Sequence, residues 1–177
     1  MEKVRTVVWT LIGIVVVILA LVLAYSLPQH RVVHVSGHEV KRLDMNGNVV
    51  DPTKAVAATR DVYFINVADP RTGEVHVYRN EDTRFGFPFY MKFDSPEVLG
   101  QAQMLEKNPD QLALVTYYGW RIKLLDEFPN AVNVEPWNSP EEPFPIFNTV
   151  FLVVLGLILL LLWWKWRQFR QRRAAKP

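Results

Sequence analysis

Residues 7–25 read VVWTLIGIVVVILALVLAY, and this stretch decides how the chain is organised. As an α-helix these 19 residues span about 28 Å, close to the roughly 30 Å hydrocarbon core of a bilayer. Only helices and closed barrels satisfy every backbone polar group inside lipid, so helix is expected despite the many Val and Ile residues. Because Leu27-Pro28 ends the run, we predict a transmembrane helix over residues 6–26.

A second apolar stretch, residues 146–164, reads IFNTVFLVVLGLILLLLWW and has the same length. Prolines at 140, 143 and 145 mark its start, since proline fits just before or inside a first helical turn. We predict a second transmembrane helix over residues 146–164. Segregation of this kind excludes a fully soluble globule and a polytopic transporter, and a chain without Cys has no disulfide-stapled or Cys-ligated metal domain.

A cleaved signal peptide is the alternative interpretation of the first stretch. Ala24, Tyr25 and Ser26 loosely resemble a small-x-small cleavage site. The apolar run of about 18 residues is longer than the roughly 7–15 residues of a signal-peptide core, which favours a retained anchor. Cleavage would leave one span instead of two and would not move the middle domain.

Charge at the two ends predicts the orientation. Residues 165–177 carry six Lys and Arg and no acid, and residues 1–5 carry a net charge of +1. The positive-inside rule therefore places both termini, 1–5 and 165–177, in the cytoplasm of a bacterium, and the middle domain, 27–145, in the periplasm. This middle domain is acidic, with 12 Lys and Arg against 17 Asp and Glu. The basic tail is expected to attract anionic lipid headgroups, and it carries no nucleic-acid-binding fold.

Aromatic residues gather at both predicted membrane boundaries. Amphipathic rings favour the headgroup regions, so these residues are interpreted as interface anchors rather than as a binding site. The predicted anchors are Tyr25 and Trp137 on the outer side, and Trp163, Trp164 and Trp166 on the inner side.

The middle domain reads mostly as strand. Strand patterns occupy residues 31–43, 61–67, 74–79, 112–120 and 131–135, and an Asn-Gly at 46–47 predicts a short hairpin. Ser95, followed by proline and glutamate, predicts a capped helix over residues 96–107, while residues 121–128 are ambiguous. The predicted fold is therefore an α+β membrane protein, in which two transmembrane helices flank a small, mainly antiparallel sheet with one or two helices.

Three histidines, His30, His34 and His38, are spaced by four residues. Imidazole is a common metal ligand, but on a strand such neighbours lie about 13 Å apart, too far for one ion. We therefore expect ordinary strand histidines, and no metal or cofactor.

A polar cluster and two aromatic segments are the remaining candidates for chemistry. Paired carboxylates flanked by guanidiniums can do acid–base work, but the same residues also suit a solvated turn or a partner-facing surface. The aromatic segment 85–93 is expected to pack in the core. If it is exposed instead, it would be an interaction surface, either a stacking platform for sugar or peptide or an apolar ledge that rests on the membrane. Arg121 is expected to pair with a carboxylate such as Glu81 or to lie on an aromatic face. The predicted partner-facing cluster is Arg79, Glu81, Asp82, Arg84, Trp120 and Arg121.

Several strings carry a resemblance to a known family: LPQH at 27–30, EVKR at 39–42, TRDV at 59–62, VYRNEDT at 77–83, KFDS at 92–95, YGWR at 118–121 and FPNAV at 128–132. Together with the two flanking spans, they resemble a family of small alphaproteobacterial membrane proteins catalogued as a domain of unknown function (DUF1523). The resemblance covers nearly the whole chain. It implies a two-span inner-membrane protein with a periplasmic domain, and it implies no activity.

The favoured hypothesis is a structural or interaction protein, or an accessory subunit of an inner-membrane complex, rather than an enzyme. Its expected partners are the lipid bilayer and another envelope protein, and not nucleic acid. One alternative is a hydrolase of an envelope component that uses Glu81, Asp82 and the arginines around them. Another is a periplasmic ligand sensor, which would need a cytoplasmic partner because the tail is short.

Overall fold

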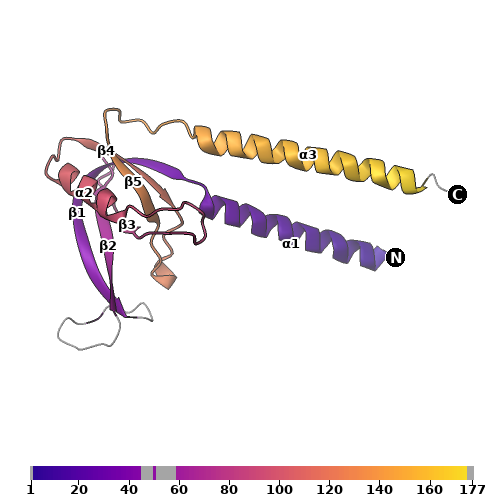
Figure 1. Cartoon of the computed structure of the whole chain (residues 1–177), viewed down its shortest axis with the longest axis horizontal. Helices are drawn as coiled ribbons and strands as arrows, with labels where there is room; N and C mark the ends of the chain where they lie inside the picture. Colours follow the sequence, from indigo (N-terminus) through magenta and orange to yellow (C-terminus); the bar gives the residue numbers. More distant parts are fainter. Residues whose placement is uncertain (1, 45–49, 51–58, 175–177) are drawn as a thin grey trace. The chain divides into compact units, whose positions relative to one another are not determined.

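The structure is a computed structural model that describes residues 2–44, 50 and 59–174. The chain divides into two compact units, Met1–Pro143 and Phe144–Pro177. Figure 1 shows the elements in chain order: α1 (Glu2–Ser26), β1 (Gln29–Asp44), β2 (Thr59–Ala68), β3 (Val75–Asn80), α2 (Ser95–Glu106), β4 (Leu112–Tyr118), the 3₁₀ turn η1 (Lys123–Leu125), β5 (Asn130–Trp137) and α3 (Ile146–Ala174).

The five strands close into a barrel in the order β1-β2-β3-β5-β4. All neighbours are antiparallel except β3 and β5, which meet in parallel where Arg79 faces Asn130. This strand order, with a helix between the third and fourth strands, is the topology of the OB-fold, a five-stranded Greek-key barrel. The mainly antiparallel sheet predicted from the sequence is confirmed, but its closure into a barrel was not predicted.

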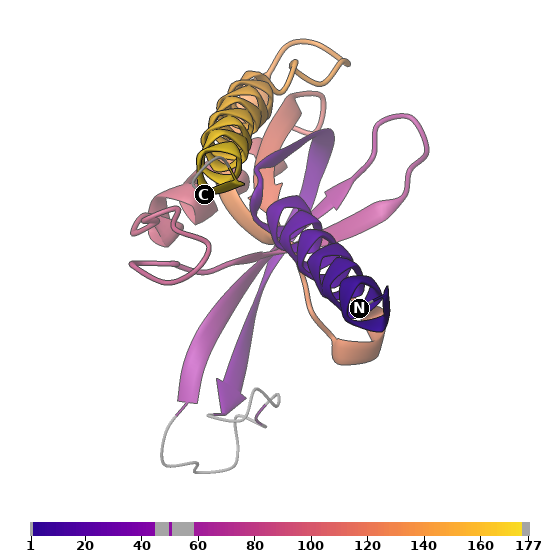
Figure 2. The same ribbon diagram turned by 90° about the vertical axis from the view of Figure 1, so that its right-hand side faces the viewer.

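One long strand makes the closure possible. The first part of β1 pairs with β4, and the second part pairs with β2. The register shifts between Val35 and Gly37. Such a bulge bends and twists a strand, so the two parts of β1 can pair with two different strands. Figures 1 and 2 show the far ends of β1 and β2 extending from the barrel as a two-stranded arm. The predicted Asn46-Gly47 hairpin lies outside the described residues.

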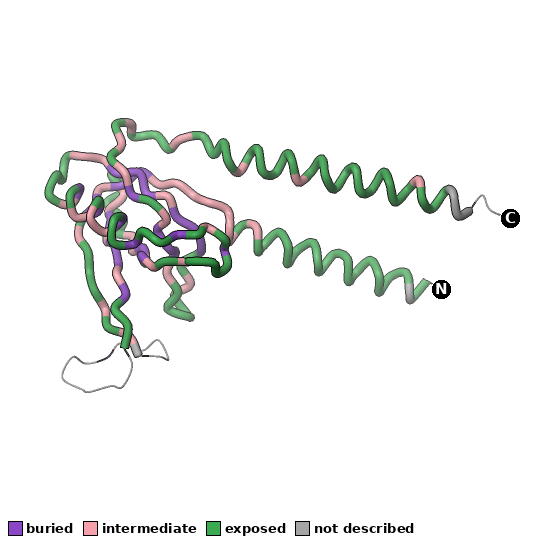
Figure 3. The backbone as a smooth tube through the Cα atoms, in the orientation of Figure 1, coloured by how far each residue is buried: buried purple, intermediate pink, exposed green. Residues whose placement is uncertain are grey.

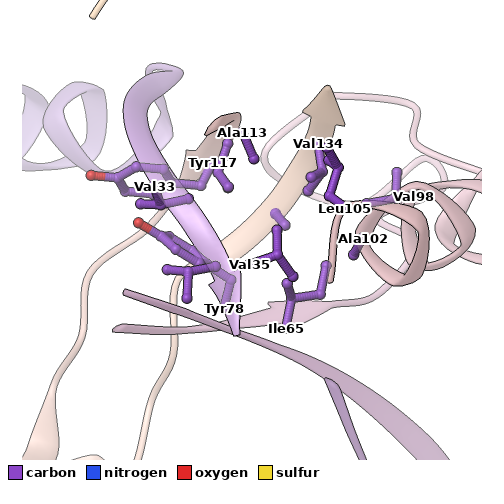
Figure 4. Close-up of a cluster of buried hydrophobic side chains, with 13 residues drawn as sticks. Val33, Val35, Ile65, Tyr78, Val98, Ala102, Leu105, Ala113, Tyr117 and Val134 are labelled. Carbon is purple, nitrogen blue, oxygen red and sulfur yellow. The ribbon is translucent and has the colours of Figure 1, made fainter. Parts of the chain in front are cut away.

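The barrel interior is filled by alternate side chains of the strands and sealed by α2. Buried valines, isoleucine and tyrosines from all five strands meet in one cluster (Figure 4). Val98, Ala102 and Leu105 repeat at helical spacing and lie on the buried face of α2. Figure 3 shows burial concentrated in the barrel, whereas α1 and α3 are exposed along most of their lengths.

The start of α2 differs from the prediction. Ser95 is not the cap but the first helical residue, and the cap position is Asp94, whose side chain makes no capping hydrogen bond. Ser95 is buried, and both its backbone N–H and its hydroxyl donate to Asp82 Oδ1, at 2.9 and 2.6 Å. The carboxylate that accepts the first N–H of this helix therefore comes from the segment before the aromatic run, and it adds to the negative charge of Glu97 in the first turn.

Two helices are long and apolar enough to cross a membrane, Arg5–Ser26 and Ile146–Gln171. Helix α3 continues without a break past Trp164, so most of the basic segment predicted as a tail is helical. The boundaries of the membrane-embedded parts remain predictions.

Candidate functional site

A buried polar cluster sits where β3 and β5 meet. It consists of Asn80, Lys92, Ser95 and Asn130, each less than a tenth exposed. Lys92 Nζ donates to Asn80 Oδ1 and, at 2.6 Å, to the carbonyl of Ala131. Asn80 Nδ2 in turn donates to the carbonyl of Ser95 at 2.8 Å. These bonds join β3, the segment before α2 and β5 into one network.

Asn130 extends the closure beyond the single backbone bridge between β3 and β5. Its Oδ1 accepts the N–H of Glu81 at 2.9 Å, and its Nδ2 donates to the carbonyl of Glu81 at 2.9 Å. The side-chain amide thus replaces a further pair of strand hydrogen bonds. Nδ2 also donates to the Tyr118 hydroxyl at 3.1 Å.

Burial perturbs the lysine of this cluster. Desolvation lowers the pKa of Lys92 to about 8, although the carboxylates of Asp94, Asp82 and Glu81 oppose the shift. The amine is enclosed by acceptors rather than open to solvent, so its geometry indicates a structural role. The burial of Lys92 was not predicted, because lysine side chains are almost always exposed and the neighbouring residues in sequence give no sign of acceptors.

The residues of the predicted partner-facing cluster lie on two separate surfaces. Glu81, Asp82 and Arg84 line an open depression of about 480 Å³ together with Arg60. Glu81 is held between Arg79, at 3.0 Å, and Arg60, at 3.1 Å. Trp120 and Arg121 line a separate cleft.

The carboxylates of the depression are engaged rather than poised for proton transfer. Burial alone would raise the pKa of Asp82, but the hydrogen bonds from Ser95 and the nearby cations outweigh it, so the pKa is lowered. Arg121 does not reach Glu81, because its guanidinium lies 3.8 Å from the Phe128 ring centroid and pairs with Asp126 at 3.1 Å. Arg121 is therefore not part of the group that Glu81 and Asp82 form with the arginines around them.

The cleft at the barrel mouth has a volume of about 530 Å³. It opens because β3 and β5 pair only at Arg79 and Asn130, so the first part of β3 faces the start of β1 and the β4–β5 loop across a gap. The cleft shares β3 and the β4–β5 loop with the usual OB-fold ligand site, which uses the face of strands 2 and 3 and the loops after strands 1 and 4. Its aromatic wall is formed by Tyr78, Tyr117, Trp120 and Phe128.

The cleft concentrates positive charge within an acidic domain. Arg31, Arg121 and Lys123 line it together with His76, and its one lining carboxylate is Glu74. Neither Arg31 nor Lys123 forms an ion pair within the part of the chain that the structure describes. Sequence analysis identified Trp120 and Arg121 but missed Arg31, Lys123 and His76, since nothing in their local patterns shows that the barrel brings them together.

The end of α1 packs against two residues that line this cleft, Gly119 and Trp120. The N–H of Gly119 donates to the carbonyl of Tyr25 at 2.9 Å. Gly119 has φ +88°, and an added Cβ would lie 3.5 Å from the Tyr25 ring, so glycine suits both the backbone and the close approach. The Tyr25 ring meets Tyr118 and Trp120 edge-on, with centroids 6.1 and 5.5 Å apart. The helix and the barrel are thus packed against each other at this point.

The aromatic segment 85–93 does not pack in the core, so that prediction is wrong. Phe85, Phe87, Phe89 and Phe93 are all more than half exposed. The buried side chains of the segment are Pro88 and Lys92. The core is already filled by α2 and the strands, which leaves the phenylalanines outside.

The predicted interface anchors have different surroundings. Tyr25 contacts the barrel, and Trp137 Nε1 donates to the carbonyl of Glu141 at 3.0 Å. Trp163, Trp164 and Trp166 are exposed on α3. Their role at a membrane surface remains a prediction.

The three histidines all lie on β1. His38 Nδ1 is 2.8 Å from Glu106 Oε2, which links the strand to the end of α2. Among the residues that the structure describes, no group of three ligating side chains converges on one point.

The fold and these surfaces define a class of protein: a small OB-type barrel flanked by two apolar helices of membrane-crossing length. Residues 4–170 match the model of the family described as "Protein of unknown function (DUF1523)", and the chain belongs to this family.

A protein from Haemophilus influenzae (strain ATCC 51907 / DSM 11121 / KW20 / Rd), described as "Uncharacterized protein", is 42% identical to this chain over 141 residues. The match covers 79% of this chain and 80% of the relative. No solved structure shows significant similarity to this chain. The family resemblance is thus confirmed, while an alphaproteobacterial origin and the two-span arrangement remain predictions.

Proposed function

We propose that this protein is a membrane-anchored interaction protein, an accessory subunit of an inner-membrane complex, which presents its barrel in the periplasm. The observation that carries the proposal is the cleft at the barrel mouth. Its concave surface combines Trp120 with two cations, Arg31 and Lys123, that form no ion pair among the described residues, and this combination is expected of a recognition surface. Its excess of positive charge favours an acidic segment of a partner envelope protein.

The contacts of α1 support a retained anchor over a cleaved leader. Cleavage after Ser26 would remove the carbonyl that Gly119 bonds and the Tyr25 ring that packs on Tyr118 and Trp120. Gly119 and Trp120, which line the cleft, would then lose these contacts. A retained α1 therefore serves two purposes, since it holds the domain at the membrane and supports two residues of the surface that the partner meets.

The hydrolase alternative has less support. Glu81 is held by two arginines and Asp82 by Ser95, so neither carboxylate is set up as a general acid. A periplasmic ligand sensor would use the same cleft but would need a second protein to carry its signal into the cytoplasm.

The proposal is tested by site-specific photocrosslinking in cells. A photoreactive residue at Lys123, on the cleft, is compared with one at Lys107, an exposed lysine beyond the end of α2. We expect a discrete protein adduct at 123 that is absent at 107, and that is lost when Arg31→Glu and Arg121→Glu reverse the charge of the cleft. Equal crosslinking at both positions, or an adduct that survives charge reversal, would contradict the proposal.

A further inference from the structure

The most unusual surface is the aromatic loop, residues 85–93, with the sequence FGFPFYMKF. Five large apolar side chains in it are exposed: Phe85 74%, Phe87 57%, Phe89 76%, Met91 58% and Phe93 53%. Single exposed apolar residues are ordinary, but five within nine successive residues form an apolar patch, and such patches mark interaction sites.

The exposed rings contact each other rather than the core. Phe85 meets Phe93 edge-on with centroids 5.4 Å apart, and Phe87 meets Phe89 at 5.9 Å. These contacts group the four rings into two pairs, and we call the two pairs together with Met91 the tip of the loop. All five side chains of the tip are exposed.

The backbone beneath the tip is fixed. Lys92 is buried in the polar cluster, and its N–H donates to Thr83 Oγ1 at 3.1 Å while its carbonyl accepts from the N–H of Arg84 at 3.0 Å. These bonds close the loop at its base. The phenylalanines are thus held outward on a prearranged frame rather than on a slack segment.

The frame is bonded to the last residue of α1. The Tyr90 hydroxyl donates to the carbonyl of Ser26 at 2.7 Å, and the Tyr90 ring stacks on Tyr118 with centroids 4.9 Å apart and planes 11° apart. Figure 1 shows the loop between β3 and α2 reaching the end of α1. Ser26 ends an apolar helix of membrane-crossing length, and Phe89 and Met91 are the sequence neighbours of the tyrosine that is bonded to this helix end.

We propose that the aromatic loop inserts into the interfacial region of the outer leaflet beside α1. The inference rests on the proposed function in one respect, namely that α1 spans the membrane. The lipid surface is the occupant that the geometry favours, because the loop that carries the tip is bonded to the helix end that would lie at that surface. Phenylalanine and methionine are also suited to the boundary between headgroups and acyl chains. The barrel is then held at two neighbouring points and cannot swing freely about α1.

The experiment uses single spin labels on the full chain, which has no native Cys. Phe89→Cys is compared with Met104→Cys, an exposed apolar residue on α2, and with Val16→Cys in the middle of α1. Each labelled chain is reconstituted into vesicles of phosphatidylethanolamine and phosphatidylglycerol. Accessibility to oxygen and to a water-soluble nickel chelate then gives the depth of each label.

We expect label 89 to be more accessible to oxygen than to nickel, with a depth at the acyl–headgroup boundary, and label 104 to behave as in water. A water-like label 89 with label 16 in hydrocarbon would overturn the loop inference alone. If label 16 is also in water, α1 does not span and the proposed function fails as well. A label 89 shielded from both reagents would indicate a protein contact, and would likewise overturn lipid insertion.

Discussion

The residues of segment 81–95 that face the barrel and those that face away from it reverse the usual distribution of side chains. On the side that faces the barrel, Lys92 and Ser95 are buried, with Lys92 4% exposed, and they join the buried Asn80 and Asn130 of the strands. On the outer side the phenylalanines of the aromatic loop are exposed. Burial of the lysine is tolerated because its amine finds acceptors on two other segments. The comparison teaches that polar bonding determines the path of this segment, while its apolar residues are left available for another surface.

The largest expected effect is the loss of the buried amine. Lys92→Ala leaves the acceptors on Asn80 and Ala131 without a donor and opens a cavity. The free energy of unfolding should therefore fall by about 3 kcal/mol. Urea unfolding of the full chain in detergent micelles, followed by near-ultraviolet circular dichroism, measures this loss. Lys107→Ala, at an exposed lysine, is the matched control and should change the unfolding free energy by less than about 0.5 kcal/mol. Equal effects of the two variants would show that the cluster does not hold the loop.

The second effect concerns the β3–β5 closure. Asn130→Ala removes the bonds with both backbone groups of Glu81, and should destabilise the barrel by about 2 kcal/mol. Asn133→Ala, at an exposed asparagine of the same strand, is the control. Hydrogen exchange resolved by residue should show faster opening of β3 and β5 only in the first variant. A uniform change along the barrel would argue against a local closure.

The third effect is a pH dependence. The pKa of Lys92 is about 8 in the folded protein and about 10.4 in an unfolded chain, so the unfolded state binds more protons between these values. Stability should therefore rise from about pH 8 to pH 10, by on the order of 1–2 kcal/mol. Lys92→Met keeps the side-chain bulk and should abolish the rise. Above pH 10 the trend should reverse, because burial raises the pKa of Tyr78 and an unfolded tyrosine ionises first.

A smaller effect is expected at the start of α2. Asp82→Ala removes the acceptor of both Ser95 bonds and should cost about 1 kcal/mol. Because the pKa of Asp82 is lowered in the folded state, its contribution is present above the unfolded pKa and is lost as the pH falls through the folded value. The unfolding free energies of the parent and Asp82→Ala chains, measured as the pH is lowered, should therefore converge at low pH. Curves that remain parallel would assign the stabilisation to another group.

The smallest effect on folding should come from the outer side. Phe85→Ser and Phe89→Ser replace rings that are about three-quarters exposed. The free energy of unfolding in micelles should therefore change by less than about 0.5 kcal/mol. A loss comparable to that of Lys92→Ala would mean that the rings contribute to the core, and the contrast between the two sides would not hold.

Local patterns predicted most elements but not what the barrel brings together. The strand expected at 74–79 and the helix expected at 96–107 require only neighbouring residues, and both are confirmed. The strand buries Tyr78 and Asn80, however, whereas Val75 is exposed. Barrel closure depends on the bulge before Gly37 and on the Asn130 amide, whose effect appears only in three dimensions. The exposed loop was mispredicted because an aromatic run usually packs inside, and the deciding residue is a buried lysine within it.

The most direct test is the sidedness of two engineered cysteines in intact cells. Lys123→Cys on the barrel and Lys165→Cys in the C-terminal segment are treated with a membrane-impermeant maleimide before and after permeabilisation of the inner membrane. A barrel held in the periplasm between two spans predicts labelling of 123 in intact cells and of 165 only after permeabilisation. Labelling of 165 in intact cells, or protection of 123 until the membrane is opened, would contradict the two-span arrangement.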